Sequence, residues 1–141
     1  MHKFNIGQSV DLITTVLRPS AAGAYEIRHL VPAPDGSKIV YEGVTLRAVL
    51  QKAGAPFGKQ LRGKVLTTYI LAKAQDGYQV IFTLGELDPD FGNETILLAD
   101  KRDGKSLPDK QGPFRLVCPN DHEGARSVRM LQTLEVVRLA K

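Results

Sequence analysis

The chain has 141 residues, of which 43% are hydrophobic and 24% are charged, and this composition excludes a disordered protein. Its one cysteine excludes an intrachain disulfide scaffold, and no apolar run approaches the roughly 20 residues that a membrane-spanning helix needs. The net charge is +4, but the nine basic residues of 101–141 are dispersed among five acidic ones, so we expect no nucleic-acid-binding surface.

Short apolar runs separated by turn residues predict strands along most of the chain. The pairs Asp35-Gly36, Asp76-Gly77 and Asp103-Gly104 are typical of tight turns that need a positive φ. The predicted strands are Asp11–Leu17, Ala24–Val31, Lys38–Tyr41, Lys64–Lys73, Tyr78–Phe82, Thr95–Ala99, Phe114–Cys118 and Leu131–Leu139.

One segment has the pattern of an amphipathic helix. Thr45 can cap its first turn, and Leu46, Val49 and Leu50 form an apolar stripe at i, i+3 and i+4. Gly54 follows at the position where a left-handed C-cap is expected.

A second, shorter helix is predicted at Leu84–Leu87, where Pro89 prevents its continuation. No repeat, low-complexity tract or linker divides the chain. The elements therefore predict an α+β, sheet-rich fold, with one or two short helices packed on a mainly antiparallel sheet, in a single domain that spans 1–141.

The residues that most often hold metals or act as nucleophiles are few. His2, His29 and His122 are far apart and lack the spacing of a metal motif, so we expect no metal site. Cys118 ends an apolar predicted strand, which favours a buried structural cysteine. A nucleophile formed by Cys118 with His29 or His122 is the alternative.

Five motifs follow one another between Tyr41 and Leu131. They are Tyr41-Glu42-Gly43-Val44-Thr45-Leu46, Asp76-Gly77-Tyr78 with Leu84-Gly85-Glu86-Leu87, Asp103-Gly104-Lys105-Ser106-Leu107-Pro108, Gly112-Pro113-Phe114-Arg115-Leu116-Val117-Cys118-Pro119 and Gly124-Ala125-Arg126-Ser127-Val128-Arg129. In this order they resemble the molybdopterin-binding domain of the sulfite oxidase family, in the form of its small single-domain bacterial members. The resemblance implies a sulfite-oxidase-type fold built around a pterin site.

In those enzymes, the loop that matches Gly124–Arg129 helps to hold the pterin and its phosphate. The resemblance therefore implies cofactor contacts for Arg126, Ser127 and Arg129, with His122 as a further candidate. Guanidinium groups suit this role because they form paired hydrogen bonds to phosphate and to a polar ring edge.

A simpler interpretation of the same loop is that its arginines are solvated cations. Arg126 and Arg129 could balance Asp121 and Glu123, and on a strand the two arginines would face opposite sides. Only a turn or a helical geometry would bring them together.

The chain departs from the family at the metal. The catalytic members ligate molybdenum through a cysteine upstream of the Tyr41 motif, whereas residues 1–42 contain no cysteine and Cys118 lies in another strand. A thiolate is a strong, soft ligand, so its absence argues against bound molybdenum and against sulfite oxidation. We assign no catalytic residue.

The leading hypothesis is a protein of the molybdopterin-dependent oxidoreductase family that binds molybdopterin or a related pterin. The alternative is a cofactor-free module that retains the fold and binds a partner protein; the sequence does not identify a redox or membrane partner. Residues 1–5 lack the apolar core of a secretory signal, while the resemblance favours an exported, periplasmic protein.

Overall fold

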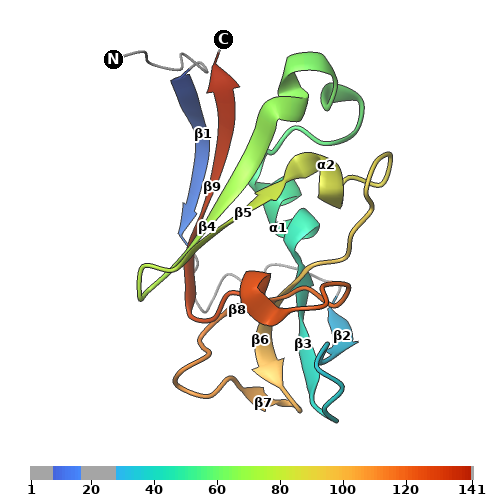
Figure 1. Ribbon diagram of the computed structural model, residues 1–141, viewed down its shortest axis with the longest axis vertical. Helices are drawn as coiled ribbons and strands as arrows, with labels where there is room; N and C mark the ends of the chain where they lie inside the picture. The colour runs from blue at the N-terminus through green and yellow to red at the C-terminus, as the bar shows by residue number, and fades with distance from the viewer. Residues whose placement is uncertain (1–7, 17–27, 141) are drawn as a thin grey trace.

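The computed structural model describes residues 8–16 and 28–140, which form two antiparallel β-sheets and two short helices (Figure 1). The first sheet has the order β1-β9-β4-β5 and contains β1 (Gln8–Val16), β9 (Leu131–Ala140), β4 (Thr68–Ala74) and β5 (Gln79–Thr83). The second sheet has the order β2-β3-β6-β7 and contains β2 (His29–Pro32), β3 (Val40–Thr45), β6 (Leu97–Arg102) and β7 (Lys105–Ser106), with β8 (Arg115–Val117) paired to β6. The predicted α+β, sheet-rich class is confirmed.

The helices and 3-10 turns connect these strands. They are α1 (Leu46–Ala53), α2 (Leu84–Leu87), η2 (Gly58–Gln60), η3 (Gly63–Thr67) and η4 (Gly124–Arg126). The predicted caps of α1 are confirmed, since the Thr45 hydroxyl accepts a hydrogen bond from the Ala48 amide and Gly54 has a φ of 97°. Neither helix of the described chain has the length and apolar composition needed to cross a bilayer.

The main hydrophobic core fills the space between the first sheet, the two helices and the second sheet. Ile70, Ala72 and Ala74 alternate along β4 and face it, as does Phe82 from β5. A second cluster covers the opposite face of the second sheet, and its members are Val31, Ala33, Tyr41, Leu97, Ala99, Leu107 and Val117. The second sheet is therefore buried in part on both faces.

This two-sided burial sets the direction of the side chains on β8. Leu116 belongs to the main core, whereas Val117 belongs to the second cluster. Because side chains alternate along a strand, Arg115 lies on the same face of β8 as Val117. The strand therefore places a cation on the side of the sheet opposite the main core.

Steric crowding explains why one position of the sequence motifs is a glycine. Gly43 follows a bulge in the pairing of β3 with β6, and a Cβ at Gly43 would lie 2.0 Å from the carbonyl oxygen of Leu98. A side chain at Gly43 would therefore force the two strands apart. The Asp-Gly turns are also confirmed, since Gly36, Gly77 and Gly104 all have a positive φ.

Several predicted elements differ from the structure. The prediction of a single sheet is wrong, because the strands form two sheets. The first part of predicted strand Lys64–Lys73 is also wrong, because η3 occupies it. Gly63 begins that turn with a φ of 56°, and the Thr67 hydroxyl donates to the Lys64 carbonyl. Of predicted strand Ala24–Val31, residues 24–27 lie outside the described residues, as does Leu17. The other strands are present with ends displaced by at most four residues.

Candidate functional site

A groove of about 1130 Å³ is lined by residues of the second sheet, the β4–β5 turn and the segment that contains η4. Four cations line it, and they are Arg102, Lys110, Arg115 and Arg129. Its two carboxylates, Asp35 and Asp76, each accept a hydrogen bond from an amide of their own turn, at Ser37 and Tyr78. Among the described residues none of the four cations forms an ion pair, so the groove is electropositive.

Arg115 is a half-buried cation of the groove and is held by neutral groups. Its guanidinium donates to the Tyr41 hydroxyl at 3.0 Å, to the Gln111 side-chain oxygen at 3.2 Å and to the Ser127 carbonyl at 3.2 Å. The guanidinium carbon also lies 4.9 Å from the centre of the Tyr41 ring. Arg115 is thus fixed in position without an ion pair to the side chains of residues 28–139, and its attraction to the Asp35 carboxylate acts at longer range.

This environment disfavours the charged form of Arg115. Burial is the largest cause that lowers its pKa, and repulsion from Arg129 and Arg102 lowers the pKa further. An arginine nevertheless stays protonated at any ordinary pH. A half-buried guanidinium surrounded by other cations is a strong attractor for an anion.

The segment that contains η4 supplies one wall of the groove. Ser127 is buried, and its hydroxyl accepts a hydrogen bond from the Cys118 amide at 3.0 Å. Arg129 is exposed and, like Ser127, lines the groove. The predicted residues Ser127 and Arg129 therefore lie at the same hollow as Arg115.

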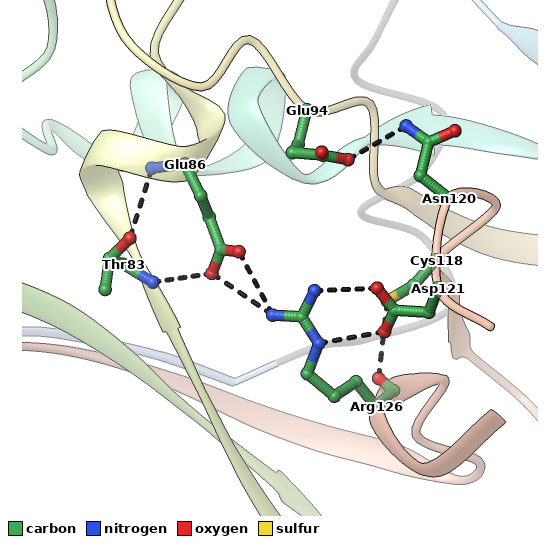
Figure 2. Close-up of polar contacts among 7 residues, drawn as sticks. All are labelled: Thr83, Glu86, Glu94, Cys118, Asn120, Asp121 and Arg126. Atoms are coloured by element: carbon green, nitrogen blue, oxygen red, sulfur yellow. Dashed lines mark hydrogen bonds and ion pairs between the residues drawn. The ribbon is translucent and has the colours of Figure 1, made fainter. Parts of the chain in front are cut away.

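Arg126 has a different environment (Figure 2). Its guanidinium forms two hydrogen bonds of 2.8 Å to the Asp121 carboxylate and contacts both Glu86 oxygens, the closer at 3.0 Å. It also lies over the Phe82 ring, 5.0 Å from its centre. Arg126 does not line the groove, so the turn at η4 separates it from Arg129 instead of bringing the two together.

His122, the fourth predicted site residue, is exposed in the loop before η4 and does not line the groove. The structure therefore places two of the four predicted residues, Ser127 and Arg129, at the groove and two outside it.

One protein-family model matches most of the chain. The model of the oxidoreductase molybdopterin binding domain matches residues 31–140, which is more than half of the chain. The chain belongs to this family. The match extends beyond the 41–131 segment that the sequence motifs cover. No curated protein matches the chain.

The donor set of this family member fits a phosphate better than a molybdenum ion. The groove offers guanidinium and ammonium groups that form no ion pair with other described side chains, and such groups suit an oxyanion. The described residues contain no cluster of histidine, cysteine and carboxylate side chains that could hold a metal. The chain's cysteine does not line the groove, since Cys118 belongs to the main core with 2% of its surface exposed.

Cys118 is held as a thiol. Burial is the largest cause that raises its pKa to about 12, and the thiol lies 3.5 Å from the Arg126 carbonyl oxygen. At neutral pH almost none of it is thiolate, the form that binds metals and attacks electrophiles. The buried, structural interpretation of Cys118 matches this environment.

Arg115, the most informative residue of the groove, was not among the predicted site residues. Arg115 lies within the Gly112–Pro119 motif. A charged residue inside the otherwise apolar predicted strand Phe114–Cys118 was the signal that could have identified it. Arg102 and Lys110 could not be found in the same way, because they are separated from Arg115 in the sequence and are gathered only by the pairing of β6 with β7 and β8.

Proposed function

We propose that the groove binds the pterin cofactor of this family, with Arg115 and Arg129 holding its phosphate group. The observation that carries the proposal is Arg115, a half-buried guanidinium that is oriented by neutral acceptors and forms no ion pair with the side chains of residues 28–139. A buried charge without a counter-ion is costly. A phosphate in the groove would supply a direct counter-ion.

The other groups of the groove suit the rest of such a ligand. The Ser127 hydroxyl accepts a hydrogen bond from the Cys118 amide and also interacts with the Cys118 thiol, so it fixes this wall of the groove. Tyr78 is 46% exposed, and its hydroxyl donates to the Ala125 carbonyl at 2.6 Å, which fixes its ring at the edge of the groove. A flat pterin could stack on that ring.

We propose that the bound form lacks a protein thiolate on molybdenum. Cys118, the chain's one cysteine, lies in the core and outside the groove. In cofactor proteins the redox chemistry belongs to the cofactor, while the protein supplies position and electrostatics. In this chain Arg115 and Arg129 would bind the ligand, and Ser127 would hold the wall of the groove in place.

Direct analysis of the purified protein tests the proposal. The chain, produced in a host that makes molybdenum cofactor, should release a fluorescent pterin after oxidation. In a second assay, purified protein is titrated with a fluorescent pterin that carries a phosphate monoester and with the same pterin after its phosphate has been removed. The phosphorylated form should bind at least tenfold more tightly.

The matched variants are Arg115→Ala, Arg129→Ala and Arg62→Ala. Arg62 is exposed in the loop before η3 and does not line the groove, so its loss should leave affinity unchanged. Arg115→Ala or Arg129→Ala removes a charge-assisted hydrogen-bond partner of the phosphate. Such a loss costs about 1.5–3 kcal/mol, so binding should weaken roughly tenfold or more. Absence of both released pterin and titrated binding would refute the proposal, and a partner protein that co-purifies with the Arg115 and Arg129 variants would favour the interaction module.

A further inference from the structure

We infer that Arg126 is a positioning residue: it ties the η4 segment to α2 so that Ser127 and Arg129 face the groove. The inference rests on the proposed function for its binding readout. It differs from the role implied by the family resemblance, in which Arg126 touches the cofactor itself.

The first observation is that each of the three guanidinium nitrogens of Arg126 already donates to a carboxylate. Nε and Nη2 bind the two oxygens of Asp121, and Nη1 binds Glu86 (Figure 2). The pKa of Arg126 is raised, mainly by its hydrogen bonds to Asp121, and the same bonds lower the pKa of Asp121. An incoming phosphate would have to displace a carboxylate from this fork.

The second observation is that both partners of Arg126 are themselves fixed. Glu86 closes a capping box on α2, since its carboxylate accepts from the Thr83 amide at 2.8 Å while the Thr83 hydroxyl accepts from the Glu86 amide. Asp121 lies in the loop after β8, where its amide donates to the Cys118 carbonyl. Arg126 therefore joins α2, this loop and η4 at one point.

The third observation connects this joint to the groove. Immediately after Arg126, the Ser127 amide donates to the Gly124 carbonyl, and the Val128 amide donates to the Arg126 carbonyl. The Ser127 carbonyl then accepts from Arg115. A displacement of η4 would move the hydroxyl of Ser127, the side chain of Arg129 and one of the neutral acceptors that orient Arg115.

The experiment compares Arg126→Ala with Glu86→Gln and Asp121→Asn, using the fluorescent pterin phosphate monoester as the probe. A positioning role predicts that each variant weakens binding, by about tenfold for Arg126→Ala and by less for the others, and that Glu86→Gln has little further effect when Arg126 is already Ala. A direct contact predicts the opposite sign: neutralising either carboxylate would free the guanidinium and tighten binding. Tighter binding by Glu86→Gln or Asp121→Asn would overturn the inference.

Amide hydrogen exchange gives a readout that needs no ligand. In Arg126→Ala, and to a smaller extent in Asp121→Asn, the Ser127 and Val128 amides should exchange at least tenfold faster, while amides in the centre of β4 keep their protection. Arg126→Lys, which keeps the charge but loses the fork, should restore only part of this protection. Unchanged exchange at Ser127 and Val128 would refute the positioning role. If the wild type binds no pterin, the proposed function fails, and exchange alone decides on the role of Arg126.

Discussion

The environment of Cys118 allows a quantitative prediction of its reactivity. Burial raises its pKa from an ordinary 9.0 to about 12. At pH 8 the thiolate fraction therefore falls from about one in ten to about one in ten thousand, a factor of about 1000. The thiolate of a weaker acid is more nucleophilic, by about 20- to 30-fold for this difference in pKa. The fall in thiolate population is the larger effect, so alkylation should be at least about 30-fold slower in the folded protein, before restricted access slows it further.

The assay is alkylation by iodoacetamide at pH 8, followed by intact mass, for the native chain and for the same chain unfolded in urea. The pH dependence supplies the sign. Between pH 8 and 10 the native rate should keep rising about tenfold per pH unit, whereas the unfolded rate should level off above a pH of about 9. Native alkylation within threefold of the unfolded rate would refute the reasoning, and it would revive a nucleophilic Cys118.

Three further predictions concern stability. Gly43→Ala should lower the free energy of unfolding by about 3 kcal/mol, the upper end of the range for overpacking, and the melting temperature by about 10 °C, because its Cβ meets the Leu98 carbonyl. Calorimetry should show little change for the control Gly124→Ala, where a Cβ meets nothing within 4 Å. An equal loss in both variants would contradict the steric argument. Thr45→Ala should cost about 1 kcal/mol in urea denaturation through loss of the α1 cap, and Thr45→Ser should recover most of it; equal stability of the Ala and Ser variants would count against the cap. Asp121→Asn should lower the free energy of unfolding by about 1 kcal/mol at pH 7. Because the pKa of Asp121 is lower in the folded protein than its ordinary value of 3.8, this difference is fully present above about pH 3.8 and should vanish as the pH falls through the folded pKa. A difference in stability that persisted in acid would show that the Asp121–Arg126 ion pair does not cause it.

The sequence predicted the local elements well. The helix at Leu46–Ala53 carries its own signals in Thr45 and Gly54, which act through contacts within a few residues. The hairpin between β6 and β7 is encoded in the same way by Asp103 and Gly104, which both have a positive φ. Such features need no knowledge of the rest of the fold.

The division into two sheets and the membership of the groove could not be predicted in this way. The pairing of β9 with both β1 and β4 joins segments that are far apart in the sequence, and no local pattern specifies it. Charges that look dispersed along 101–141 converge at one groove for the same reason. The family motif identified the η4 segment but not the direction of Arg126, which depends on Glu86 in a distant helix.

The electropositive groove has a consequence for how the sequence can change. In the absence of an anion, Arg129 and Arg102 each repel Arg115, so the empty protein is less stable than one with a neutral groove. Selection for thermostability alone would remove the exposed Arg129 first. Its loss relieves the repulsion of Arg115 and breaks no side-chain hydrogen bond with the described residues. Retention of that arginine in descendants of this chain would therefore mark selection for an anionic ligand acting against selection for stability.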